Sequence, residues 1–202
     1  VCEVAKAYNV PCPFSANVKT ARQKHLMRQA VDRAGLSNPK YKLAYNWEEV
    51  EKAAQEIGYP LVLKPVDLAS SAFVKLIQTS NDLQQAYRDL ENFPLNFRDQ
   101  ERERAFLLEE YICGEEVSVE TVSNNGEITV VGITDKSVTG SPYFIENGHM
   151  FPAKLDEDVK EEIGDYVRNV LLATGYDHGI AHTEIKLTKD GPKVVEINPR
   201  TA

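Results

Sequence analysis

The sequence predicts an α+β protein, with helices packed against two lobes of mostly antiparallel sheet. Segments with helical periodicity are interspersed with shorter runs in which apolar and polar residues alternate, which is the pattern of a half-buried strand. The turn signals Asn124-Asn125-Gly126 and Lys189-Asp190-Gly191 each join two such runs, as is typical of β-hairpins and of antiparallel pairing. A chain of 202 residues is long enough to bury one large core or two small ones.

The helices are expected where apolar residues recur every three or four positions, over residues 1–10, 20–36, 47–57, 81–93 and 156–175. Thr20 is the expected N-cap of the helix over 20–36, and Gly35 is its expected C-terminal signal. Strands are expected over residues 41–45, 61–66, 105–112, 115–123 and 127–137, at the end of 67–79, and in the two runs that flank Lys189. Residues 141–155 are expected to be irregular.

The order of these elements predicts three parts. Residues 1–39 form a linker and helices that lead into the core, residues 40–112 form a smaller lobe, and residues 113–202 form a larger one. Residue 1 falls inside a predicted helix, and residue 202 follows the last predicted strand closely. We therefore expect the sequence to be a piece of a longer chain.

Composition narrows the class of partner. The formal net charge of −8 and the isoelectric point near 5.1 disfavour nucleic acid and anionic membranes as main partners. No apolar run approaches the ~20 residues that span a bilayer, and the start of the sequence lacks the pattern of a signal peptide. The three cysteines include no C-x-x-C pair, which favours reduced cysteines over disulfides or a zinc site. A cytoplasmic protein is expected.

The last predicted hairpin carries the strongest chemical signal. With a three-residue loop at 189–191, Glu184 lies directly across from Glu196, and His182 lies across from Asn198. Carboxylates about 5 Å apart on neighbouring strands repel each other unless a cation lies between them. Oxygen ligands of this kind favour a hard cation such as Mg²⁺. The alternatives are a solvated polar face, and a bulge at Gly191 that would shift the register by one residue.

Three other features carry weaker signals. Lys64 interrupts an apolar strand, which indicates either a phosphate or carboxylate partner or a lysine that reaches solvent from an edge strand. The small residues 69–72 could bring backbone N–H groups to phosphate oxygens, or form a plain turn. Glu146 and His149 lie in the polar stretch 141–155, which is either a substrate-contacting loop or a merely structural one.

Several segments together resemble the ATP-grasp superfamily of carboxylate–amine ligases. The resemblance extends from the helix at residue 22 to the end of the chain, and the segments that carry it occur in the family's order: RQKHLMRQAVDRAGL, YPLVLKPV, the small-residue loop, LLEEYICGEEVSVE, HTEIKLT and VVEINPR. It implies the ATP-grasp fold, with ATP bound between the two lobes. The stretches PYFIENGHMFPAKL and GIAHTEI are most similar to the branch that joins amino acids.

The resemblance implies how the nucleotide is held. Lys24 and Lys64 reach its phosphates, and loop 67–73, with Ser70 and Ser71, covers them. Glu116 accepts hydrogen bonds from the ribose hydroxyls. The hinge that reads the adenine consists of Glu109, Glu110, Tyr111 and Ile112.

The resemblance also implies the chemistry. Glu184, Glu196 and Asn198 hold Mg²⁺, or Mn²⁺ in its place. Arg200 steadies an acyl phosphate, and His182 either points toward the same group or is a structural histidine. The implied partners are a small-molecule carboxylate and an amine, both amino acids, and the implied assembly is a homodimer.

The sequence departs from the family pattern at two places. Gln23 stands where the family often has aspartate, and the loop LASSAFV lacks the usual glycines. Two alternatives to an amino-acid ligase therefore stay open. One is another ATP-grasp enzyme, such as a purine-pathway ligase or a biotin-carboxylase-like enzyme, although Glu115-Glu116 stands where a carboxylase carries a basic pair. The other is an ATP-binding module without catalysis.

Overall fold

The computed structural model describes residues 2–10, 12, 14–68, 72–96, 99–138 and 146–201, without the side chains of Cys2, Val138, Glu146 and Asn147. The chain divides into two units. Unit 1 combines Val1–Asn38, Cys113–Ser137 and Gly148–Ala202, and unit 2 combines Pro39–Ile112 and Val138–Asn147. In this division the first 38 residues group with the second half of the chain.

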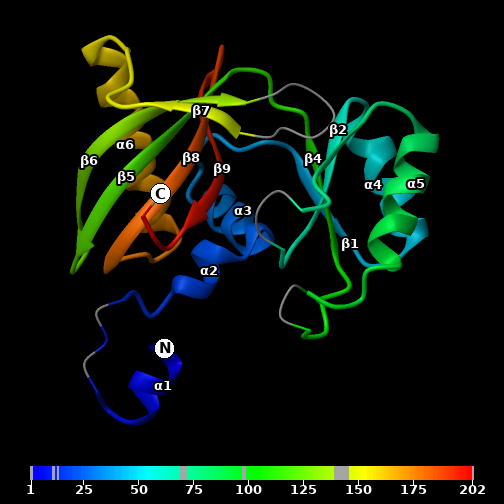
Figure 1. Cartoon of the computed structure of the whole chain (residues 1–202), viewed down its shortest axis with the longest axis horizontal. Coiled ribbons are helices and arrows are strands. Elements are labelled where there is room, and N and C mark those ends of the chain that lie inside the picture. Colours follow the sequence, from blue (N-terminus) through cyan, green and yellow to red (C-terminus); the bar gives the residue numbers. More distant parts are fainter. Residues whose placement is uncertain are drawn as a thin grey trace. The chain divides into compact units, whose positions relative to one another are not determined.

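Unit 2 contains an antiparallel four-stranded sheet in the order β1-β4-β2-β3 (Figure 1). Helices α4 and α5 pack on one face of this sheet, because their apolar stripes share one core cluster with its strands. The elements are β1 (Tyr41–Ala44), α4 (Trp47–Ile57), β2 (Leu61–Pro65), β3 (Lys75–Ile77), α5 (Ser80–Glu91) and β4 (Phe106–Glu110).

Local signals explain where the two helices of unit 2 begin. The Asn46 side chain accepts a hydrogen bond from the backbone N–H of Glu49, and α4 ends before Gly58, where φ is +86°. The Thr79 hydroxyl and the Asp82 carboxylate form a reciprocal capping box at the start of α5. Both helices therefore lie within two residues of the predicted limits.

A five-stranded sheet in the order β7-β6-β5-β8-β9 lies in unit 1, except for Val138 of β6 and Glu146 and Asn147 of β7, which group with unit 2. Helices α3 and α6 share its core cluster with the inward-facing residues of β5, β6, β8 and β9. The elements are α1 (Cys2–Ala7), α2 (Val18–Arg22), α3 (Lys24–Arg33), β5 (Glu115–Asn124), β6 (Glu127–Val138), β7 (Glu146–Met150), α6 (Glu157–Ala173), β8 (Gly179–Thr188) and β9 (Gly191–Asn198). Among the described residues, no helix is long and apolar enough to cross a membrane.

The single helix predicted over residues 20–36 is wrong. The chain forms α2 and α3, separated by Gln23 in an extended conformation, and Thr20 lies inside α2 instead of capping it. In one continuous helix, side chains six positions apart would point about 120° away from each other. The break lets Ala21 and Met27 both enter the same core cluster. Gly35, at φ +67°, follows the helix end as predicted.

The prediction that residues 141–155 are irregular is wrong for the part that is β7. Residues Glu146–Met150 pair with β6 at the edge of the sheet. Their sequence, ENGHM, contains no β-branched residue and no apolar alternation, so local preference does not mark a strand there. The neighbouring strand supplies the hydrogen-bonding partner that the local sequence does not indicate.

Candidate functional site

The β8–β9 hairpin brings together the residues that the sequence pairs. Glu184 lies opposite Glu196, and His182 lies opposite Asn198, so both predicted pairings are confirmed. The loop is shorter than predicted, because Thr188 pairs with Gly191 and leaves only Lys189 and Asp190 in the turn. A bulge between the Val194 and Glu196 positions restores the predicted register.

The bulge changes which valine faces the core. Val194 is fully buried, Ile197 is 3% exposed, and Val195 between them is only half-buried, so strict alternation, which would put Val195 on the same face as Ile197, does not hold. Strict alternation would put residues three apart on opposite faces of a strand. The extra residue at Val195 lets Val194 and Ile197 both enter the core.

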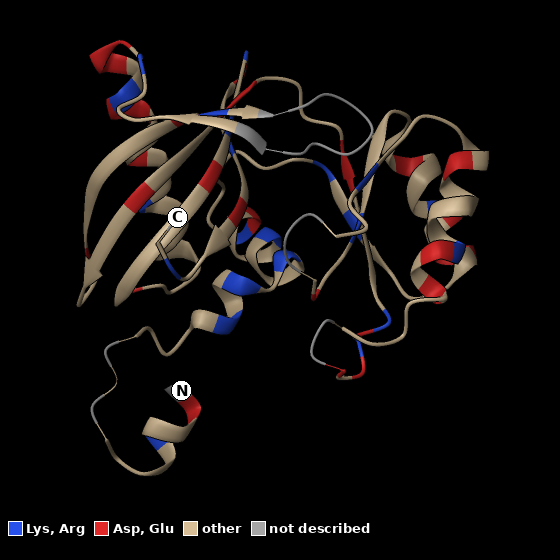
Figure 2. Cartoon of the chain, viewed as in Figure 1, with Lys and Arg blue, Asp and Glu red and all other residues tan. Residues whose placement is uncertain are grey.

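Charged side chains gather on the opposite face of this sheet, which we call the polar face. Figure 2 shows acidic positions on the strands of unit 1 and basic positions on α2 and α3. The polar face comprises Glu116 and Glu120 of β5, Lys136 of β6, His182, Glu184 and Lys186 of β8, and Glu196 and Asn198 of β9.

Each of the two facing carboxylates contacts a lysine. Lys24 Nζ lies 2.8 Å from Glu196 Oε2, and Lys136 Nζ lies 2.9 Å from Glu184 Oε1. Asn198 Nδ2 donates to Glu196 Oε1 over 2.9 Å. These contacts offset the repulsion between the two carboxylates.

A second group of contacts joins Glu116 to the same lysine. Glu116 lies between Lys136 and Lys186, at 3.1 Å and 3.2 Å. The Lys136 side chain is 1% exposed and contacts Glu116 and Glu184 together. The proposed ribose acceptor and the proposed metal ligand are thus connected through one buried cation.

His182 is buried and lies between two glutamates. Its Nδ1 is 2.5 Å from Glu120 Oε1, and its Nε2 is 3.6 Å from Glu184 Oε1. The interaction with Glu184, followed by that with Glu120, raises the pKa of His182 above its usual 6.5 despite the opposing effect of burial. The two glutamates therefore stabilise the protonated imidazole relative to the neutral one.

The sequence alone indicates no functional role for Glu120, Lys136 and Lys186, which the structure places on the polar face. The alternation of Glu116, Ser118 and Glu120 along β5 indicates a polar stripe. Lys136 comes beside this stripe through the β5–β6 hairpin, but that the stripe lies beside β8 depends on the pairing of β5 with a strand that is distant in sequence. A local pattern does not contain this information.

Three further predicted residues, Arg200, His149 and Glu146, lie outside the group of charged side chains that forms the polar face. Arg200 is exposed, and its Nη1 donates to the backbone oxygen of Thr201. His149 is exposed on β7, and the Glu146 side chain lies outside the described part of the chain. Among the described residues, Arg200 forms no hydrogen bond or ion pair with the facing glutamates.

In unit 2, Lys64 is buried against Glu109. Lys64 Nζ lies 2.6 Å from Glu109 Oε2, and their side chains are 6% and 4% exposed. The alternative in which Lys64 reaches solvent from an edge strand is therefore excluded. Glu110, Tyr111 and Ile112 follow at the end of β4 and are half-buried. Ser70 and Ser71 lie outside the described residues.

The facing glutamates suit a metal that arrives with its own ligands. Within the described ranges, no group of three or more His, Cys, Asp or Glu side chains is arranged to hold a metal ion. Mg²⁺ in nucleotide sites needs only one or two carboxylates, because phosphates and water complete its coordination. Two carboxylates, one amide and the neighbouring lysines fit a magnesium–nucleotide complex better than a metal bound by protein alone.

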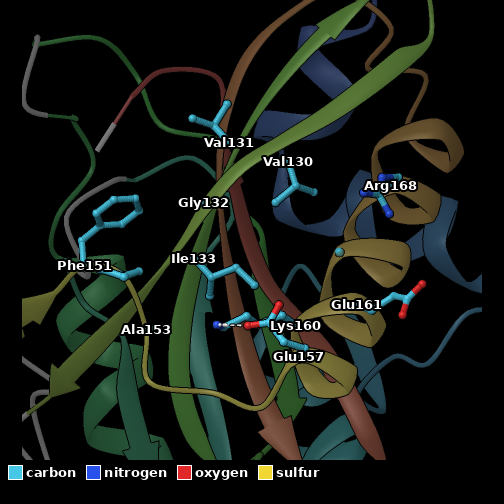
Figure 3. A pocket seen from close by; sticks show the side chains of 12 residues that line it. Val130, Val131, Gly132, Ile133, Phe151, Ala153, Glu157, Lys160, Glu161 and Arg168 are labelled. Carbon is cyan, nitrogen blue, oxygen red and sulfur yellow. Dashed lines mark hydrogen bonds and ion pairs between the residues drawn. The ribbon is translucent and has the colours of Figure 1, made fainter.

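A separate surface pocket of about 500 Å³ lies between β6 and α6 of unit 1 (Figure 3). Its walls include Val130, Ile133 and Ala153, and charged side chains of α6 such as Lys160 and Glu161 stand at its rim. None of the predicted site residues lines it. The pocket is therefore distinct from the polar face.

Comparison with known proteins identifies the family. A family model described as an ATP-grasp domain matches residues 57–202. The chain belongs to the ATP-grasp family. Both the predicted resemblance and the predicted α+β ATP-grasp fold are confirmed by this match and by the solved structures that the chain resembles.

Among curated ATP-grasp relatives, alanine–anticapsin ligase of Bacillus amyloliquefaciens is 32% identical over 200 residues, which cover 91% of this chain and 42% of that protein. The L-amino acid ligase structure from Bacillus licheniformis is 27% identical, with a TM-score of 0.79, and the match covers 98% of this chain and 45% of that one. The VanG D-Ala:D-Ser ligase structure from Enterococcus faecalis has a TM-score of 0.81, with 98% and 58% coverage, and at 20% identity it shows the shared fold alone. The chain thus spans less than half the length of its curated ligase relatives.

Proposed function

We propose that this chain is the nucleotide-binding part of an ATP-dependent ligase that joins a carboxylate to an amine through an acyl phosphate. The observation that carries the proposal is the placement of Glu184 opposite Glu196, with Asn198 bonded to Glu196 and a lysine on each carboxylate. The family and the named relatives, which are ligases of amino acids, support amino acids as both substrates. The net charge of −8 supports small molecules over nucleic acid as partners.

Glu184, Glu196 and Asn198 are the residues that would hold Mg²⁺, or Mn²⁺ in its place. The bound metal would neutralise phosphate charge in the nucleotide and orient the transferred phosphoryl group. Lys24 and Lys136 contact the same carboxylates and supply positive charge beside them. These cations let the two carboxylates approach each other before any nucleotide binds.

Other residues of the proposed site bind the rest of the nucleotide. Lys24 and Lys64 would bind its phosphates, with Ser70 and Ser71 covering them. Glu116 would accept hydrogen bonds from the ribose, and its contacts with Lys136 and Lys186 hold its carboxylate in place. The adenine would be read at the end of β4 by Glu109, Glu110, Tyr111 and Ile112.

The proposed reaction needs no covalent bond to the protein. The terminal phosphoryl group of ATP passes to a substrate carboxylate oxygen, which gives an acyl phosphate and ADP. The amine nitrogen then attacks the acyl carbon, phosphate leaves, and the amine loses a proton. Such a reaction depends on alignment and on cations near the phosphoryl oxygens. His182, whose pKa the interactions with Glu184 and Glu120 raise, and Arg200 are the residues proposed to stabilise the acyl phosphate.

Phosphate release by the full-length protein tests the proposal. The protein is mixed with Mg²⁺, ATP and pairs of amino acids, and phosphate is measured for each pair, for each single amino acid and for bicarbonate. Release that requires an acid and an amine together, with a condensed product in the mass spectrum, supports the ligase. Release with bicarbonate would indicate a carboxylase instead, and nucleotide binding with no release under any condition would indicate a non-catalytic module.

A further inference from the structure

The bulge at Val195 lets β9 meet two structural requirements at once. The core needs Val194 and Ile197, and the polar face needs Glu196 opposite Glu184. A bulge leaves backbone groups without their usual ladder partners, and β9 is also the edge strand of the five-stranded sheet. An unsupported bulge beside an open edge would leave the direction of Glu196 poorly defined.

Two buried side chains bind the backbone at this bulge. Arg28 of α3 is fully buried, and its guanidinium donates to Val194 O over 2.6 Å and to Val195 O over 3.2 Å. Tyr166 of α6 accepts a hydrogen bond from Val194 N over 3.0 Å. The bulge is therefore bound on its open side by a planar fork of donors and by a hydroxyl.

Both side chains are themselves held in place. The Tyr166 hydroxyl donates to Ser37 O over 2.6 Å, and burial raises the pKa of Tyr166, which keeps the phenol protonated for that bond. Arg28 Nη1 donates to Asn38 Oδ1, while Asn38 Nδ2 donates back to the Arg28 backbone oxygen. The loop after α3 thus orients both groups toward β9.

Helix α3 also connects the bulge to the charged site. Lys24, which contacts Glu196, precedes Arg28 by four residues on the same helix. Residues four apart lie on the same side of a helix, one turn from each other. One helix therefore contacts both the backbone just before Glu196 and the carboxylate itself.

From these contacts we infer that Arg28 and Tyr166 are positioning residues, which hold the β9 bulge and thereby direct Glu196 toward the metal of the bound nucleotide. Together the two side chains bind the backbone of Val194 and Val195, and each acts on Glu196 through that backbone. The part of this inference that concerns the metal rests on the proposed function, whereas the part that concerns the bulge rests on the observed contacts.

Two conservative variants of the full-length protein test this role. Tyr166→Phe keeps the ring and removes the hydroxyl, and Arg28→Lys keeps the charge and removes the planar fork. Mn²⁺ binding in the presence of ADP is followed by electron paramagnetic resonance, and ADP binding in excess chelator is followed by calorimetry. We expect roughly tenfold weaker Mn²⁺ binding, which is the usual cost of disturbing groups that orient a metal ligand. We expect ADP binding without metal to stay within about twofold of the wild type, since the phosphate and adenine groups are unchanged.

Two matched substitutions serve as controls. Tyr87→Phe removes a tyrosine hydroxyl in unit 2, where it donates to Glu91, and Arg33→Lys alters an exposed arginine near the end of α3. Both controls are expected to bind Mn²⁺ as the wild type does. Unchanged Mn²⁺ binding in Tyr166→Phe and Arg28→Lys would overturn the inference, and so would equal weakening of ADP with and without metal. If Arg28→Lys does not fold, Tyr166→Phe decides.

A readout without nucleotide separates this inference from the proposed function. Backbone amide exchange and cross-strand proton contacts between Glu184 and Glu196 are measured by NMR in the ligand-free protein. We expect faster exchange of the Val194 amide and weaker Glu184–Glu196 contacts in Tyr166→Phe, with unchanged exchange at Val119 of β5. If wild-type protein binds no Mn²⁺ with ADP, the proposed function fails. The positioning role then stands or falls on the NMR result, and an unaltered hairpin in both variants would refute it.

Discussion

The two units each contain buried lysine–carboxylate contacts, but they differ in how far the contacts are sealed. In unit 2, Lys64 and Glu109 form a pair in which both side chains are at most 6% exposed. In unit 1, Lys136 contacts Glu116 and Glu184, whose side chains are 12% and 15% exposed, and Glu196 is 24% exposed. A sealed pair mainly avoids the cost of an isolated buried charge. A partly open group of charges can exchange partners with an arriving ligand.

This difference predicts that substitutions on the polar face lower activity with little effect on stability, whereas substitutions of the sealed pair lower stability as well as the proposed nucleotide binding.

Glu196→Gln is expected to reduce ATP turnover of the full-length enzyme by roughly 100-fold or more, as loss of a pre-organised charge does at other catalytic sites. The fold should persist, because Lys24 and Asn198 can still hydrogen-bond to the amide oxygen. Turnover is measured as phosphate release, and folding by thermal melting. Glu127→Gln, an exposed glutamate on β6 of the same unit, is the control. Turnover of Glu196→Gln equal to the control would exclude Glu196 as a metal ligand.

Lys64→Met is expected to lower the free energy of unfolding by about 3 kcal/mol, because it leaves the Glu109 carboxylate buried beside an apolar side chain. The double variant Lys64→Met/Glu109→Gln should recover part of this loss, since no buried charge remains. Urea denaturation measures both. Lys42→Met, which removes an exposed pair with Glu56, should change the free energy far less. A single variant as stable as the double variant would show that the pair is not sealed as described.

His182 predicts a pH dependence of stability. Its pKa is higher in the folded chain than the usual 6.5, so its contribution to stability is fully present below pH 6.5 and is lost as the pH rises through the folded pKa. His182→Gln should remove this component. The measurement is the free energy of unfolding across that range for both proteins. An identical slope in wild type and variant would show that Glu184 and Glu120 do not stabilise the charged imidazole.

Lys160→Met is expected to change the free energy of unfolding by no more than about 0.5 kcal/mol. Lys160 pairs with Glu157 one turn away on α6, and the Glu157 side chain is 90% exposed. Chemical denaturation measures this change, which gives the effect expected for an exposed ion pair, to be compared with that of the sealed pair. A loss as large as that of Lys64→Met would mean that exposure does not separate the two kinds of pair.

The sequence by itself determined the class of fold, the helices α4, α5 and α6, and the pairing of Glu184 with Glu196. These features are local: a helix depends on periodicity and caps within a few turns, and a hairpin depends on the turn and strands on either side of it. The family resemblance, which is also confirmed, likewise depends on short local motifs that occur in a fixed order. The roles that it assigns to single residues remain proposals.

The hairpin also shows where local reasoning reaches its limit. The predicted three-residue loop and the observed two-residue loop with a bulge place Glu184 and Glu196 in the same register, but they direct different valines into the core. Arg28 and Tyr166 bind the backbone at the observed bulge, and both lie outside the hairpin in sequence. No pattern within the hairpin contains that information.

Tertiary structure alone likewise decided the break at Gln23, the strand β7 and the partners of the facing glutamates. Core packing requires Ala21 and Met27 on one side, and the neighbouring strand β6 makes a strand of ENGHM. Lys136 and Glu120 reach the polar face only because β5 pairs with both β6 and β8. The local sequence determines which side chains each strand carries. The free energy that brings Lys136 beside Glu184 comes from burying apolar surface between segments that are far apart in sequence.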